Sequence, residues 1–176
     1  MPGADLNLPM KPLRIAILTV SDTRTIETDT SGAALVERLQ SAGHFLADRK
    51  IVVDDISKIR TIVQGWIADP QIDAVITTGG TGLTGRDVTY EAVTPLFEKT
   101  IDGFSVIFHL ISYESVGVST LQSRATAGIA NGTAIFCLPG SIGAVKDGWD
   151  KIIAHELDAR YRPCNLVELM PRFMER

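Results

Sequence analysis

The chain has 176 residues, of which 45% are hydrophobic and 22% charged, and its formal net charge is −4. This length and composition fit one globular domain with a full hydrophobic core. The acidic balance argues against a nucleic-acid partner or an anionic membrane surface, because either would require clustered Lys and Arg. A small anionic ligand stays compatible with this charge, since backbone N–H groups bind phosphate without net positive charge.

The sequence carries no metal or disulfide pattern. Cys137 and Cys164 are far apart and the three histidines have no ligand spacing, so neither a disulfide framework nor a structural zinc site is indicated. Residues 1–13 contain three prolines, and we interpret them as a flexible arm before a single domain, residues 14–176. They do not resemble a signal peptide, and no apolar stretch approaches the ~20 residues of a membrane span. We therefore expect a cytoplasmic protein.

Strand and helix patterns alternate along the chain. Apolar, β-branched runs predict strands at residues 14–22, 45–55, 72–80 and 133–140. Apolar residues at helical spacing predict helices at residues 30–42, 56–70, 89–99, 103–113 and 142–157. Thr30 or Ser31 is expected to cap the first helix, and Pro95 to kink the third. This order predicts an α/β fold in which helices cover both faces of a mostly parallel sheet.

Three of the predicted strands end in polar or glycine-rich turns. Parallel strands bring these ends to one rim, and open α/β sheets bind ligands at that rim. The sequence therefore predicts one binding site there. The residues that these turns place at the rim are Ser21, Asp22, Thr78, Gly79, Gly80, Thr81, Gly82, Pro139, Gly140 and Ser141.

The turn after residue 78 is the most informative segment. Three glycines within residues 79–82 let the backbone adopt positive φ, and successive N–H groups then form a concave anion site to which threonine hydroxyls can add donors. A tight turn without a ligand would need only one glycine. Gly80, Gly82 and Gly85 also satisfy the dinucleotide pattern GxGxxG, but they do not open the first βα unit, and we interpret that match as chance. A Walker A loop is excluded, because no Lys-Ser or Lys-Thr follows.

Charged residues flank this turn. Asp87 could cap the helix that begins near Thr89, or it could hold magnesium or orient a phosphate; Thr89 could supply the cap itself, which favours the functional role. Arg86 could clamp a phosphate bidentately or pair with a nearby acid, and both roles stay open.

Two further positions combine capping with the predicted site. Asp55 is expected to cap the helix after the second strand, which leaves Asp54 free to reach the rim. Ser141 is expected to be an N-cap, and the same geometry would place a helix N-terminus at the rim as a second phosphate site.

Several segments together resemble a known family. They are TTGGTGLTGRDVT, the VSD turn, LQSRATAG, FCLPGS and LDARYRPCN. The sequence resembles the molybdenum cofactor biosynthesis proteins of the MoaB/MogA group over residues 14–165, and LQSRATAG and the tail resemble the B-type members. The resemblance implies a three-layer α/β/α sandwich, the molybdopterin-binding fold, assembled as homotrimers or as hexamers that are dimers of trimers.

The resemblance also implies a reaction and its residues. The wider group includes enzymes that adenylylate molybdopterin with ATP and Mg²⁺. The family's two functional aspartates match Asp54 and Asp87, which implies catalytic and metal-holding roles, and its phosphate loop matches residues 78–82. Its serine matches Ser123, and Arg124 is carried with it as a ligand-binding residue.

Three functions of different classes stay open. The first is a molybdopterin adenylyltransferase with pterin and nucleotide as its small-molecule partners. The second is a catalytically silent pterin carrier that works through other cofactor-assembly proteins, and the third is a nicotinamide-dependent oxidoreductase. The presence of both Asp54 and Asp87 favours the first.

Overall fold

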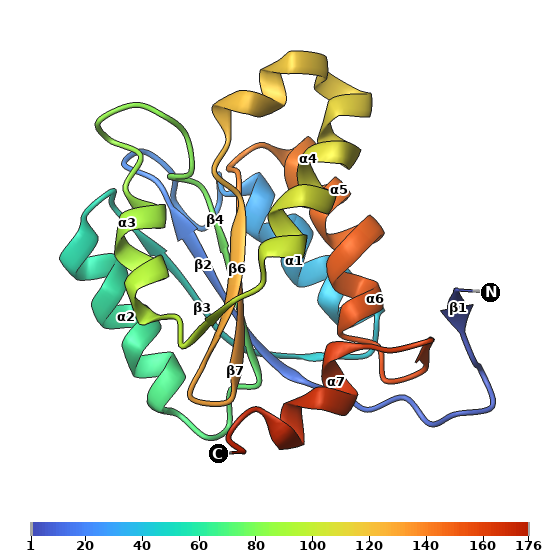
Figure 1. The fold of residues 1–176 in the computed structure, drawn as a ribbon. Helices are drawn as coiled ribbons and strands as arrows, with labels where there is room; N and C mark the ends of the chain where they lie inside the picture. The colour runs from blue at the N-terminus through green and yellow to red at the C-terminus, as the bar shows by residue number, and fades with distance from the viewer. Residues whose placement is uncertain (1, 176) are drawn as a thin grey trace.

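The central sheet contains six strands in the order β3-β2-β4-β7-β6-β5, as the computed structural model of the chain shows for residues 2–175 (Figure 1). β2, β3, β4 and β7 are parallel, whereas β6 runs antiparallel to β7 and to β5. The strands are β2 (Arg14–Val20), β3 (Phe45–Val52), β4 (Ala74–Thr78), β5 (Lys99–Thr100), β6 (Thr126–Ala130) and β7 (Thr133–Leu138). The predicted α/β fold with a mostly parallel sheet is confirmed.

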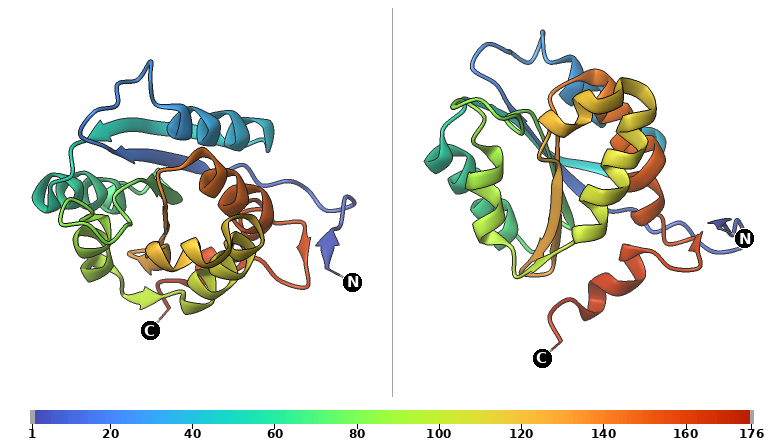
Figure 2. Two further views of the ribbon diagram at one scale, coloured as in Figure 1. Left: turned by 90° about the horizontal axis from the view of Figure 1, so that it is seen from above. Right: turned by 45° about the horizontal axis from the view of Figure 1, so that its top comes forward.

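Helices cover both faces of the sheet and give three layers (Figure 2). The α-helices are α1 (Thr30–Ser41), α2 (Ile56–Ala68), α3 (Thr89–Val93), α4 (Asp102–Val116), α5 (Ile142–Gly148), α6 (Ala154–Glu156) and α7 (Leu166–Leu169). The 3-10 helices are η1 (Thr94–Leu96), η2 (Gly117–Gln122) and η4 (Met170–Arg172), and η3 (Trp149–Ile153) is a π-helix. α2 and α3 lie on one face, and α1, α4 and α5 lie on the other.

Successive side chains of a strand point to opposite faces of the sheet, so one strand contributes to the hydrophobic core on each face. In β2, Ile15 and Ile17 pack toward α1, α4 and α5, whereas Ala16 and Leu18 pack toward α2 and α3. Strands buried on both faces are mostly apolar, which explains the long apolar runs in the sequence, although Thr19, Thr77 and Thr78 are also buried at the ends of β2 and β4.

The sequence prediction missed the antiparallel half of the sheet. β6 reads TAGIA, which has little strand character, and it joins β7 through Asn131 and Gly132 at φ values of 46° and 83°. Asn-Gly is the preferred pair for a two-residue hairpin because both positions need positive φ, so the signal was present at that turn. The α1 cap also differs from the prediction: Asp29, and neither Thr30 nor Ser31, accepts the Gly32 N–H.

The arm predicted as flexible, residues 1–13, contacts the domain near both of its ends. β1 (Gly3–Ala4) pairs antiparallel with β8 (Tyr161–Arg162), and the Asp5 N–H donates to the Arg160 carbonyl at 2.9 Å. At the other end, the buried Leu13 donates its N–H to Nδ1 of His44 at 3.1 Å. The flexibility of the arm between these contacts stays a prediction.

One stretch contradicts the expectation that no apolar run approaches the length of a membrane span. Residues 102–122, which form α4 and η2, have the length and mean hydropathy (1.2) of a spanning helix, a test that core helices of soluble proteins also satisfy. Phe104 and Phe108 on this helix are buried in the core. Only 17% of its most apolar 18-residue window is buried, however, and side chains such as Leu110 and Val118 are 66% and 69% exposed.

Candidate functional site

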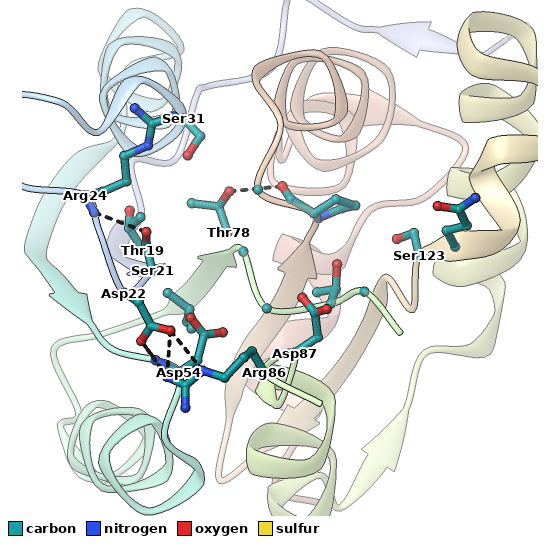
Figure 3. Close-up of a pocket in the computed structure, with 18 of the residues that line it drawn as sticks. Thr19, Ser21, Asp22, Arg24, Ser31, Asp54, Thr78, Arg86, Asp87 and Ser123 are labelled. Carbon is teal, nitrogen blue, oxygen red and sulfur yellow. Dashed lines mark hydrogen bonds and ion pairs between the residues drawn. The ribbon is translucent and has the colours of Figure 1, made fainter. Parts of the chain in front are cut away.

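The carboxyl ends of β2, β4 and β7 meet at one edge of the sheet and form a cleft with a volume of about 420 Å³. The end of β3 adds a fourth wall, because β3 lies beside β2 in parallel. This arrangement brings together all the residues predicted for the site except Arg124 and Ser141, which do not line the cleft. The predicted convergence of strand ends is therefore observed (Figure 3).

The glycine turn after β4 directs backbone N–H groups away from the helix behind it. Gly79 and Gly80 have φ values of 100° and 67°. The buried Thr89 donates its N–H to the Gly80 carbonyl at 2.9 Å and its hydroxyl to the Gly79 carbonyl at 2.8 Å. Because C=O and N–H of a trans peptide point in opposite directions, the N–H groups of Gly80 and Thr81 point away from Thr89. They are therefore available to an anion.

Arg124 holds this turn from outside the cleft. Its guanidinium donates to the Gly82 carbonyl at 3.0 Å and to the Asp87 carbonyl at 2.9 Å, and it forms an ion pair with Glu91. It also lies 5.1 Å from the ring centroid of Tyr90. Arg124 therefore lies outside the cleft lining, and its donors are bound to the two ends of the segment between Gly82 and Asp87. Its predicted contact with a ligand stays a prediction.

Asp54 lies at the end of β3 and faces the turn (Figure 3). A Cβ on Gly80 would come within 3.0 Å of its Oδ1 atom. Burial and the neighbouring Asp22 charge raise the pKa of Asp54, although the Arg86 guanidinium opposes the shift. Asp55 caps α2 by accepting the Lys58 N–H at 2.8 Å. The predicted roles of the two acids, Asp55 as the cap and Asp54 at the rim, are therefore confirmed.

The Asp87 carboxylate accepts hydrogen bonds from within its own loop. Its Oδ2 atom accepts the Thr84 N–H at 3.0 Å and the Thr84 hydroxyl at 2.6 Å. Burial opposes the ionised form, but these hydrogen bonds outweigh it and lower the pKa of Asp87. The capping alternative is wrong, because α3 begins after Val88 without a side-chain cap. Asp87 stays on the cleft wall while it braces residues 82–87.

Asp22 and Arg86 form an ion pair across the mouth of the cleft (Figure 3). Nη2 of Arg86 lies 2.7 Å and 2.6 Å from the two carboxylate oxygens, and Nε lies 3.0 Å from Oδ2. The carboxylate also accepts the Asp54 N–H at 3.1 Å. The hydrogen bonds from Arg86 lower the pKa of Asp22. Of the two roles left open for Arg86, the pairing with an acid is observed.

A second cavity adjoins the cleft. It has a volume of about 300 Å³, lies between α4, η2 and the start of α5, and shares Gln122, Ser123 and Pro139 with the cleft. Ser141 lines this cavity, and its hydroxyl caps α5 by accepting the Ala144 N–H at 3.2 Å. The capping role predicted for Ser141 is confirmed.

Some residues of the cleft were missed from the sequence. Thr19, Arg24, Thr30, Ser31 and Gln122 line it. Behind them, the buried Asp29 accepts hydrogen bonds from the Thr19 hydroxyl at 2.7 Å and from Arg49 Nη2 at 2.8 Å. The segment from residue 22 to residue 29 is polar without periodicity, so no pattern in it indicates that its last residue is buried and charged.

The glycine run does not form a dinucleotide fingerprint. Gly80, Gly82 and Gly85 follow the third strand of the parallel set, and the next helix begins only at Thr89. In that fingerprint the glycine run opens a helix directly and places its N-terminus on the pyrophosphate. The interpretation of GxGxxG as a chance match fits this geometry.

Comparison with known proteins decides the family. The profile described as "Probable molybdopterin binding domain" matches residues 16–159, which include the cleft. Molybdenum cofactor biosynthesis protein B of Escherichia coli K12 is 51% identical over 154 residues, which cover 88% of this chain and 91% of that protein. The Bacillus subtilis protein of the same name is 48% identical over 146 residues, which cover 82% of this chain and 86% of that protein. The chain belongs to the molybdenum cofactor biosynthesis protein B family.

Solved structures of this family have the same fold. A crystal structure of molybdenum cofactor biosynthesis protein B superposes with a TM-score of 0.81 at 46% identity, covering 84% of this chain and 92% of that chain. The tungsten cofactor synthesizing protein MoaB from Pyrococcus furiosus superposes with a TM-score of 0.74 at 38% identity, covering 82% and 92%. The molybdopterin-binding fold implied by the sequence motifs is therefore confirmed.

Proposed function

We propose that this protein acts in molybdenum cofactor biosynthesis by binding molybdopterin and transferring an adenylyl group to it from ATP. The observation that carries the proposal is the convergence of the glycine turn and the Asp54 carboxylate on one cleft. Family membership supports the pathway, and the anion-binding geometry supports phosphate substrates.

The reaction joins two phosphate esters. An oxygen of the molybdopterin phosphate attacks the α-phosphorus of ATP, the bond from that phosphorus to the bridging oxygen breaks, and pyrophosphate leaves with the electron pair. Phosphoryl chemistry of this kind needs positioning and charge stabilisation more than a protein nucleophile. The N–H groups of Gly80 and Thr81 would hold the nucleotide phosphates, and the adjoining cavity beyond Ser123 would take the pterin.

The residues present fit a magnesium ion that arrives with ATP. Mg²⁺ prefers oxygen ligands, keeps several waters, and is commonly held by one or two carboxylates together with substrate phosphates. Within residues 2–175 no group of three or more His, Cys, Asp or Glu side chains is arranged to hold a metal by itself. Asp54 and, from the same wall, Asp87 would hold the ion, which would supply charge neutralisation for the leaving pyrophosphate.

The test is incubation of the purified protein with molybdopterin, ATP and Mg²⁺, with pyrophosphate and adenylylated pterin followed over time. We expect product with the wild type and none with Asp54→Asn. Binding of the pterin without pyrophosphate release would refute the transferase and leave the carrier function. Binding of NAD without binding of ATP would instead support the oxidoreductase.

We also propose that the unpartnered face of α4 and η2 is a contact between copies of this chain, in a homotrimer or a dimer of trimers. Its apolar side chains are 48–75% exposed, namely Val106, Ile107, Leu110, Tyr113, Val116, Val118 and Leu121. An apolar patch of this kind marks an interaction site. Leu110→Asp should yield monomers in sedimentation analysis, whereas a monomeric wild type would refute the proposal.

A further inference from the structure

We propose that Arg86 is the phosphate-binding arginine of the cleft and that Asp22 holds its guanidinium until a phosphate takes the place of the Asp22 carboxylate. The inference rests on the proposed function, because it assigns roles to two residues that line the same cleft. It goes beyond that function by assigning Arg86 to phosphate binding and Asp22 to competition with the phosphate for Arg86.

The other arginines near the cleft are bound to parts of the scaffold. Arg124 is bound to loop carbonyls and Glu91, and Arg49 is bound to the buried Asp29. Arg24 lines the cleft, and its Nη1 atom donates to the Thr28 carbonyl of its own loop at 3.0 Å. Arg86 differs, because its guanidinium is held by a carboxylate on the cleft wall and 66% of its side chain is exposed. The ion pair of Arg86 with Asp22 is therefore a contact within the cleft that a phosphate can replace.

The contact between Arg86 and Asp22 has the geometry of a phosphate contact. Nε and Nη2 of Arg86 both lie within 3.0 Å of Asp22 Oδ2. The guanidinium fork binds carboxylate and phosphate in the same bidentate manner, so a phosphate oxygen can replace a carboxylate oxygen at this position. Figure 3 shows the pair beside Asp54, on the same wall of the cleft.

The charges of the cleft favour this exchange. Its lining carries the carboxylates of Asp22, Asp54 and Asp87 against the guanidinium groups of Arg24 and Arg86. A polyphosphate that enters while Arg86 is still paired meets three carboxylates, and one of them already neutralises the charge of Arg86. Transfer of Arg86 from Asp22 to the phosphate gives the ligand its counter-charge.

This mechanism predicts an effect with an unusual sign. Asp22→Asn keeps an oxygen that accepts the Asp54 N–H but removes the charge that competes for Arg86. It should therefore tighten phosphate binding, although it weakens an ion pair. If the pair only joined the two loops, the same substitution would loosen the cleft and weaken binding.

The experiment is calorimetric titration of the full-length protein with inorganic pyrophosphate in EDTA at low salt. We expect Asp22→Asn to bind about two- to fivefold more tightly than the wild type, the range for release of one exposed ion pair. Arg86→Ala should bind about tenfold or more weakly, because charge-assisted hydrogen bonds are lost. Arg86→Lys, which keeps the charge without the fork, should fall between Arg86→Ala and the wild type.

A matched control is available at Asp150. It forms a bidentate pair with Arg38, at 3.0 Å and 3.2 Å, and does not line the cleft. Asp150→Asn removes the same charge from the protein and should leave pyrophosphate affinity unchanged.

The outcomes separate this inference from the proposed function. The inference is overturned if a folded Asp22→Asn protein binds pyrophosphate as tightly as the wild type or more weakly. It is also overturned if Arg86→Ala or Arg86→Lys binds pyrophosphate as tightly as the wild type. In these cases a wild type that binds pyrophosphate leaves the proposed function standing. A wild type that does not bind pyrophosphate overturns the inference and removes the phosphate site from the proposed function as well.

Discussion

Asp54 and Asp87 should respond in opposite directions when their charge is removed. The folded protein raises the pKa of Asp54, because burial and the Asp22 charge disfavour its ionised form. It lowers the pKa of Asp87, because Thr84 donates two hydrogen bonds to one carboxylate oxygen. We therefore expect Asp54→Asn to stabilise the fold at neutral pH and Asp87→Asn to destabilise it.

Both effects should be small because both carboxyls contact solvent. For Asp54→Asn we expect a gain in unfolding free energy of about 0.5 kcal/mol after allowance for solvent screening. For Asp87→Asn we expect a loss of about 1 kcal/mol, since a neutral amide oxygen accepts hydrogen bonds less strongly than a carboxylate. In a domain of this size, 1 kcal/mol corresponds to about 2–4 °C in Tm. Adenylyl transfer should be lost in both variants.

The pH dependence gives the Asp54 prediction its control. Its folded pKa lies above its ordinary value of 3.8, so below that value the carboxyl is protonated in both states and has no effect on stability. As pH rises from 3.8 through the folded pKa, the wild type loses stability relative to Asp54→Asn, and above the folded pKa the difference stays constant. Calorimetric Tm values at pH 3 and pH 8 test this. A Tm difference that is the same at both pH values, or a lower Tm for Asp54→Asn at pH 8, would refute the reasoning.

Other substitutions test the scaffold of the glycine turn. Thr89→Val keeps the shape of a buried side chain but leaves the Gly79 carbonyl without its hydroxyl donor, so we expect a loss of about 1–3 kcal/mol in denaturant titration and weaker pyrophosphate binding. Gly79→Ala would place a Cβ 2.2 Å from the Val20 carbonyl oxygen at a φ of 100°, so we expect the free energy of unfolding to fall by more than about 2 kcal/mol. The matched control is Gly65→Ala in α2, whose Cβ meets nothing within 4 Å and which should raise the free energy of unfolding by about 0.5–1 kcal/mol. Arg124→Lys and Glu91→Gln should each lower kcat more than they raise KM for ATP, and the double variant should be no worse than Arg124→Lys alone; additive losses would show that the two residues act separately.

The location of the site could be predicted from the sequence because it depends on short-range patterns. Buried strands are apolar at most positions, and the turns that follow them are rich in polar residues and glycine. The parallel order of the sheet then decides which ends meet, as it does for Asp22, Thr78 and Gly140. The hairpin of β6 and β7 was missed because β6 has little strand character, although Asn131 and Gly132 mark its turn.

The individual roles of the site residues could not be predicted, because each role depends on which distant residue a side chain contacts in the folded protein. Arg124 and Arg86 look alike in the sequence, since each lies beside a glycine-rich or polar rim segment. In the structure Arg124 reaches the carbonyls of Gly82 and Asp87 behind the turn, whereas Arg86 reaches the Asp22 carboxylate at the mouth of the cleft. Contacts separated by 37 or 64 residues leave no local pattern.

This difference between the residues that hold the glycine turn and the Arg86–Asp22 pair has a physical consequence for phosphate chemistry. Electrostatic stabilisation is most effective when the donors are already in place and need no reorganisation during the reaction. Thr89, Arg124 and Asp87 bind the glycine turn from behind or brace it from within, so its N–H groups are fixed before any ligand arrives. Arg86 and Asp22, by contrast, form an ion pair at an exposed position. A rigid backbone site beside an exchangeable ion pair allows the cleft to be preorganised for phosphate, while the positive charge of Arg86 is transferred only to a ligand that competes successfully with Asp22.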